Sequence, residues 1–188
     1  LRRSRGLGDV YKRQMEEMSP DDRARLFEEL PAKVVRQLLD QLSPEERKVT
    51  AELLGYEAET AGRLMTTEYI ALKENQTALE ALDIVRRRAR DTETIYSLYV
   101  TDNERRLTGI LSLRDLVTAD PNNLIRDVMT EEVLSVRTDT DQEKVARTIQ
   151  RYDFLAVPVV DLEQRLVGIV TVDDVIDVIE QEATRDLY

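Results

Sequence analysis

The chain of 188 residues contains no histidine, no cysteine and no tryptophan. Without cysteine, disulfides, thiolate nucleophiles and zinc–thiolate sites are excluded. Without histidine, an imidazole metal ligand, a histidine general base and a Ser-His-Asp triad are excluded as well. A bound metal would therefore have only oxygen ligands, which favours Mg²⁺, Ca²⁺ or Mn²⁺ over zinc or copper.

Aromatic residues and long hydrophobic runs are also scarce. Aromatic residues make up 5% of the chain and hydrophobic residues 41%, so we expect aliphatic cores in one domain or two small ones. The longest mostly apolar stretch, Phe154 to Val160, is far too short to span a bilayer. The sequence thus predicts a soluble polypeptide.

The charge is mostly of one sign. The chain has 38 acidic and 27 basic residues, and this net charge of −11 argues against a nucleic-acid partner, whose phosphates would be repelled. Five of the basic residues lie in residues 1–14, which lack periodicity and end in a stretch that matches a translated transposase adapter. We predict that residues 1–14 are non-native, with a natural basic arm as the alternative. Without them the net charge is −15.

A helical repeat follows. Ser19-Pro20 and Ser43-Pro44 each combine an N-cap residue with proline at the first helical position and acids in the first turn. Pro31 opens a third helix between them, and Gly55 closes the series. The period of about 24 residues predicts a short all-α superhelical segment.

A second repeat fills the rest of the chain. Met65-Thr66 returns as Met129-Thr130, 64 residues later, and residues 100–115 match residues 159–174 at a separation of 59. Each copy reads as strand, helix, strand, strand, helix, with the first strands over residues 69–72 and 133–136. The pattern predicts an α+β unit used twice.

The motifs of this second repeat resemble a known family. Residues 109–115 (GILSLRD) and 168–174 (GIVTVDD) are similar to a tandem pair of CBS domains. Together with the helical repeat, residues 54–66 and the acidic ending at residues 171–184 resemble the cytosolic region of the MgtE family of magnesium transporters. The resemblance implies a helical domain fragment at 15–55, CBS domains at 56–120 and 121–183, and the start of a linker helix at 184–188.

The last helix is the strongest candidate for chemistry. Val172, Val175, Ile176 and Ile179 predict a core-facing stripe, and acids on the other side repel one another at i, i+3 and i+4. A solvated acidic face and a cation site are both compatible with that pattern. The resemblance favours Mg²⁺ bound between facing acidic surfaces, and it implies the ligands Asp21, Asp22, Asp141, Glu143, Asp153, Asp174, Asp177, Glu182 and Asp186.

Several of these acids have a simpler interpretation. Thr140 and Glu143 have the spacing of a capping box, as Thr77 and Glu80 do in the first copy. Acids near a helix start, such as Asp21 and Asp22, also interact favourably with the helix dipole. Arg185 stands in the acidic tail where the family pattern has a carboxylate.

The helix starts that follow strands offer a nucleotide site. In CBS domains similar to these, the hydroxyl lies near phosphate and the aspartate accepts from ribose, which points to Ser112, Arg114 and Asp115 for ATP or another adenine nucleotide. The alternative is a simple N-cap. The second copy has Asp173 in place of Arg114, which would repel phosphate.

The sequence therefore predicts a regulatory module and no enzyme, because no nucleophile–base pair stands out. By resemblance, the module senses Mg²⁺ at the cytoplasmic face of the cell membrane, forms a homodimer through its CBS domains and closes a membrane pore that lies outside this chain. The alternative is a soluble CBS pair that senses an adenine nucleotide for another protein.

Overall fold

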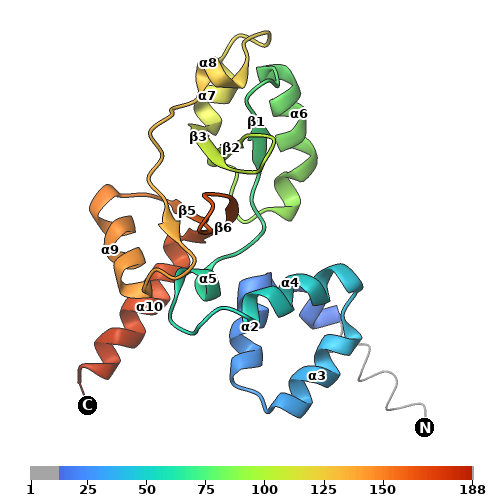
Figure 1. The fold of residues 1–188 in the computed structure, drawn as a ribbon, viewed down its shortest axis with the longest axis vertical. Helices are drawn as coiled ribbons and strands as arrows, with labels where there is room; N and C mark the ends of the chain where they lie inside the picture. The colour runs from blue at the N-terminus through green and yellow to red at the C-terminus, as the bar shows by residue number, and fades with distance from the viewer. Residues whose placement is uncertain (1–12, 188) are drawn as a thin grey trace.

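The computed structural model describes residues 13–187, so most of the predicted non-native segment 1–14, and Tyr188, lie outside the described residues. Figure 1 shows the two α+β repeats one above the other, with the helical segment below them. The elements are α2 (Pro20–Glu28), α3 (Ala32–Gln41), α4 (Pro44–Leu54), α5 (Ala61–Leu64), β1 (Ala71–Lys73), α6 (Ala78–Arg88), η1 (Ala89–Asp91), β2 (Ser97–Thr101), β3 (Leu107–Ser112), α7 (Leu113–Thr118), α8 (Ile125–Val128), β4 (Val136–Arg137), α9 (Gln142–Tyr152), β5 (Ala156–Val160), β6 (Leu166–Thr171) and α10 (Val172–Arg185).

The helical segment forms the three predicted helices α2, α3 and α4. Ser43 caps α4 by accepting from the backbone N–H of Glu46, whereas the hydroxyl of Ser19 donates to the Asp22 carboxylate. Phe27 and Leu42 are buried in a small core of the segment's own. The prolines and acidic first turns therefore predicted the helix starts correctly.

A fully buried arginine holds this segment together. The Arg23 guanidinium donates to the carbonyl oxygens of Met15 and Met18, to Glu46 Oε2 at 2.6 Å and to the Thr50 hydroxyl at 2.9 Å. These bonds tie α2 to α4 and to the helical turn at residues 13–17. A segment with few buried apolar side chains thus relies on a buried polar network.

Each repeat forms a three-stranded sheet with two helices. In the first, β1 runs parallel to β2 and β2 antiparallel to β3, and β4, β5 and β6 repeat this order in the second. The predicted order of strand, helix, strand, strand, helix is confirmed. The first strand of each copy starts two or three residues later than predicted, because Tyr69 and Val133 lead into the sheet without pairing in it.

The two α+β repeats exchange their leading segments. α5 and Met65, which precede the first sheet, pack into the core of the second repeat, while α8 and Met129 pack against the core of the first. Thr66 bridges to Ile169, and Thr130 bridges to Ile110. The packing therefore crosses the sequence division at residue 121.

Glycine makes this exchange possible at both places. A Cβ on Gly168 would lie 2.5 Å from the Met65 sulfur and 2.9 Å from the Thr66 carbonyl oxygen, and a Cβ on Gly109 would lie 2.4 Å from the Met129 sulfur. Real Cβ atoms do not approach so closely, so each glycine provides the space for the leading methionine of the other repeat.

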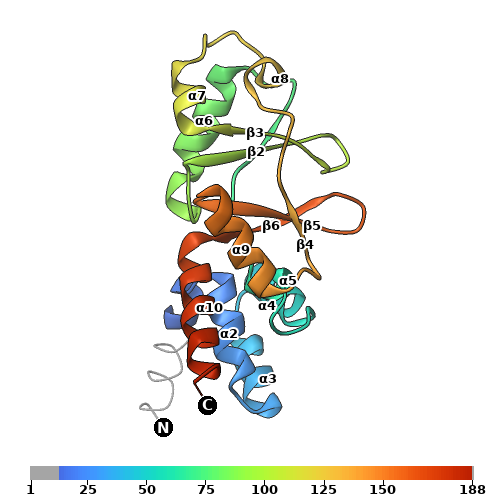
Figure 2. The same cartoon turned by 90° about the vertical axis from the view of Figure 1, so that its left-hand side faces the viewer.

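The helical segment shares a hydrophobic core with the second repeat. Ala24 and Leu53 are buried in the same core as Val175 and Val178 of α10, and Figure 2 shows α2 beside α10. The predicted stripe on α10 is partly wrong, because Ile176 is 48% exposed. Contact with both α9 and α2 instead turns Val175 and Val178 inward and brings Asp174 with them.

Candidate metal centre

Three predicted ligands meet where α2 and α10 begin. One carboxylate oxygen from each of Asp21, Asp22 and Asp174 lies within 4.8 Å of the others, and we call these three residues the carboxylate cluster. Each helix contributes its acidic first turn. The cluster therefore lies between two helix N-termini, whose partial positive charge favours anions there.

Burial makes the cluster electrostatically unusual. Asp21 is 2% exposed and Asp174 is 7% exposed, whereas Asp22 faces solvent. Burial, followed by the charge of Asp21, raises the pKa of Asp174 to about 7. Burial and the charge of Asp22 also raise the pKa of Asp21. Ionised carboxylates are thus costly here unless a cation compensates them.

Hydrogen bonds occupy both oxygens of Asp174 and leave a buried oxygen of Asp21 without a partner in the described residues. Thr171 donates its hydroxyl to Asp174 Oδ2 at 2.9 Å, and the second oxygen of Asp174 accepts from Arg25. Among residues 13–187, Asp21 Oδ1 is buried without a hydrogen-bond partner. Three carboxylates and one unsatisfied oxygen form a hard, oxygen-only donor set, which fits Mg²⁺ or Ca²⁺.

Further acidic groups surround the cluster. Burial raises the pKa of Glu68 to about 7, and the charge of Glu93 adds to the effect. Burial raises the pKa of Glu93 as well, followed by the charges of Asp21 and Asp22. Sequence reasoning missed both glutamates, because Glu68 lies before β1, Glu93 lies between η1 and β2, and no motif places them beside α2.

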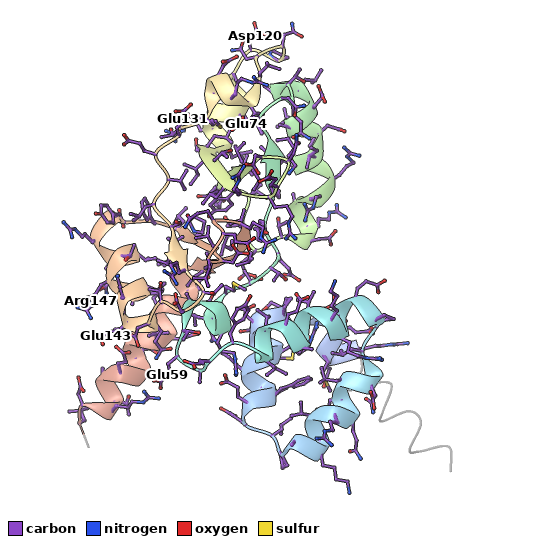
Figure 3. All side chains as sticks on the ribbon, in the orientation of Figure 1. Glu59, Glu74, Asp120, Glu131, Glu143 and Arg147 are labelled. Carbon is purple, nitrogen blue, oxygen red and sulfur yellow. The ribbon has the colours of Figure 1, made fainter. Side chains whose placement is uncertain are left out.

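Predicted ligands on α9 lie elsewhere. Asp141, Glu143 and Asp153 are exposed, and Asp141 and Asp153 stand at opposite ends of the helix. Figure 3 shows Glu143 and Arg147 on the outer side of α9, away from the helical segment. None of these three acids joins the carboxylate cluster.

The capping box predicted from Thr140 and Glu143 is wrong. α9 begins one residue later, and its N-cap is Asp141, which accepts from the backbone N–H of Glu143 at 2.9 Å. Thr140 instead accepts from the backbone N–H of Arg137. In the first repeat, the box of Thr77 and Glu80 is confirmed.

The remaining predicted ligands extend along α10. Asp177 accepts from Arg25 at 3.2 Å, while Glu182 and Asp186 lie near the end of the helix and outside the carboxylate cluster. Arg185 pairs with Glu59 at 2.6 Å, so it binds the linker that follows the helical segment. A cavity of about 320 Å³ opens beside the Arg25 side chain between this linker, α2 and α10.

Comparison with known proteins identifies the family. The model of the MgtE intracellular N domain matches residues 10–59, and the CBS domain model matches residues 61–122 and 125–181. A crystal structure of the cytosolic domain of the Mg²⁺ channel MgtE in complex with ATP is 50% identical, with a TM-score of 0.86 over 89% of this chain and 69% of that chain. The chain belongs to the MgtE family.

Two full-length MgtE relatives define the extent of the match. The magnesium transporter MgtE of Thermus thermophilus is 54% identical over 153 residues, which make up 81% of this chain and 34% of that protein. The Enterococcus faecalis transporter is 52% identical over 76% of this chain and 31% of its own length. This chain thus spans about a third of these relatives. Between residues 13 and 187, every helix falls short of the length and hydrophobicity that a membrane span requires.

The predicted nucleotide residues of this MgtE chain lie at the start of α7. Ser112 caps the helix by accepting from the backbone N–H of Asp115 at 3.0 Å, so the N-cap interpretation is confirmed. Arg114 and Asp115 are exposed. The equivalent Thr171 differs, since its hydroxyl is directed to the Asp174 carboxylate and makes no cap bond in the described residues.

Proposed function

We propose that this chain is a Mg²⁺-sensing regulatory module of a magnesium transporter or channel. In this proposal, a divalent ion at the carboxylate cluster holds α2 against α10, an arrangement that we call closed. Loss of the ion leaves the carboxylates to repel one another, and the helical segment then moves away from the second CBS repeat. The observation that carries the proposal is the cluster itself, which joins two elements about 150 residues apart in the sequence.

The electrostatic energies are of the size that such a switch requires. Two unit charges about 5 Å apart interact by roughly 3 kcal/mol at an effective dielectric of 20. Moving a two-state equilibrium from 1:99 to 99:1 takes roughly 5.5 kcal/mol of differential binding. A few bridged carboxylate pairs therefore suffice, whereas one pair alone does not.

The absence of cysteine makes the closed arrangement directly measurable. We expect dyes on Cys residues introduced at the exposed positions Lys33 and Gln150 to report the distance from α3 to α9 by energy transfer. Mg²⁺ should shift the population towards the short distance, because it neutralises the cluster. NaCl at matched ionic strength and an Asp22→Asn variant serve as controls. A distance distribution that responds to Mg²⁺ no more than to NaCl would contradict the proposal.

The same proposal places the module in a larger assembly. The relatives are magnesium transporters of which this chain matches about a third, so we infer a membrane pore domain as its partner and the cytoplasmic face of the cell membrane as its location. We also infer a homodimer through the CBS repeats. Large exposed apolar side chains support it, since they recur at matched positions 59 residues apart: Tyr96 and Leu155, and Val117 and Ile176.

A second candidate function is adenine nucleotide binding. The similar crystal structure that contains ATP supports it, as do Ser112, Arg114 and Asp115 at the start of α7. By calorimetry, we expect ATP to bind the wild-type chain and Asp115→Asn to weaken binding about tenfold, because a charged hydrogen-bond acceptor is lost. Asp177→Asn should leave the affinity unchanged. Equal ATP affinities of the wild type and Asp115→Asn would exclude this site.

A further inference from the structure

One arginine occupies the contact that the proposed ion would strengthen. Arg25 lies on α2 one turn after Asp21 and Asp22, and its guanidinium reaches across to α10. One terminal nitrogen lies 3.0 Å from Asp174 Oδ1 and the other lies 3.2 Å from Asp177 Oδ2. A single side chain thus bridges two acids of the second CBS repeat.

The guanidinium makes the kind of connection that a bridging cation makes. Asp174 and Asp177 are three residues apart on one helix face, where like charges repel. A planar fork can satisfy both carboxylates at once from two separate nitrogens, whereas a lysine has a single ammonium nitrogen. The Arg25 side chain is 30% exposed and that of Asp174 is 10% exposed, so this contact is less screened than a surface ion pair.

The arginine and the ion would also use the same oxygens. Asp174 accepts from Thr171 with Oδ2 and from Arg25 with Oδ1, so an ion that binds Asp174 would share one of these oxygens with a hydrogen-bond donor. The cavity of about 320 Å³ beside Arg25 gives the side chain and a hydrated ion room to rearrange.

We propose that Arg25 is a tethered cation that sets how strongly the module depends on a divalent ion. It keeps part of the population closed when no ion is bound, and the ion then adds to this contact. The ion-dependent part of the inference rests on the proposed function, whereas the ion-free part does not.

The test compares Arg25→Gln with the wild type in the energy-transfer assay, first in EDTA. We expect the variant to lower the ratio of closed to open molecules about tenfold, because it loses two charge-assisted hydrogen bonds across the contact. Mg²⁺ should then produce a larger change in the variant than in the wild type. Arg25→Lys should give an intermediate ratio.

Arg147→Gln is the matched control, because Arg147 is exposed on the outer side of α9 and pairs only with Glu143 among the described residues (Figure 3). It should behave as the wild type. An Arg25→Gln variant that keeps the wild-type ratio in EDTA would overturn the inference. If Mg²⁺ closed neither protein, the proposed function would fail, while opening of Arg25→Gln in EDTA would still support the tether.

Discussion

Asp174→Asn is expected to stabilise the ion-free protein at pH 8 and to remove most of its response to Mg²⁺. Burial and the charge of Asp21 raise the pKa of Asp174 from 3.8 to about 7, so the folded protein bears the cost of ionising this group above that pH. The difference corresponds to at most about 4 kcal/mol. An asparagine carries no charge, and it offers a donor to a cluster that contains the unpartnered Asp21 Oδ1.

The sign of the pH dependence follows from the same shift. A raised pKa in the folded state means that folding favours protonated Asp174. The stability that this protonated carboxyl contributes is therefore present at low pH and is lost as the pH rises through about 7. In EDTA, the free energy of unfolding of the wild type should therefore rise as the pH falls from 8 to 5. Asp174→Asn should make this rise smaller, and Glu68, whose pKa is also raised to about 7, should account for part of what remains.

Asp115→Asn provides the control for Asp174→Asn. Asp115 occupies the same position of the first repeat, 59 residues earlier, but it is exposed. Its variant should keep both the pH profile and the Mg²⁺ response, as followed by denaturant unfolding and calorimetry. A destabilised Asp174→Asn protein at pH 8 in EDTA would show that the ionised carboxylate is favourable there, which would remove the basis for an ion-driven switch.

Arg23→Met is expected to unfold the helical segment while the CBS repeats stay folded. The substitution leaves the Met15 and Met18 carbonyl oxygens and the Thr50 hydroxyl without their buried donor. Breaking a buried charged network by removing one partner costs about 3–5 kcal/mol, which is large for a segment of some forty residues.

Hydrogen exchange resolves this effect by region. Amides of α2 and α4 should lose protection in Arg23→Met, and those of β2 and β5 should keep it. Arg36→Met changes an exposed arginine of α3 and should leave both groups unchanged. Equal loss of protection in all four elements would mean that the helical segment and the CBS repeats unfold as one unit.

The fold could be predicted because its signals are local. Ser43-Pro44 marks a helix start by capping and proline geometry alone, and the two copies of the strand–helix pattern reveal each other by repetition. The exchange of α5 and α8 could not be predicted in this way. It depends on which of two equivalent glycines, Gly109 or Gly168, each leading methionine contacts, and both choices satisfy the same sequence pattern.

The candidate site was predicted only in part. The resemblance pointed to Asp21, Asp22 and Asp174, and the structure brings these three together. It also pointed to a second acidic site with Asp141 and Glu143, which are exposed at the start of α9 and outside the carboxylate cluster. Arg25 was missed because its role is tertiary, as its partners lie on α10 and nothing in its local sequence indicates them.

The exchange of leading segments also determines how a movement of the helical segment is transmitted. The linker at residues 56–60 runs directly into α5, and α5 is buried in the core of the second repeat. Arg63 on α5 donates to the Leu54 and Tyr56 carbonyl oxygens and pairs with Glu28. This one side chain thus holds the start of the linker and the end of α2 against α5. In the proposed switch, a movement of the helical segment would therefore reach the second repeat directly, through α5 as well as α10.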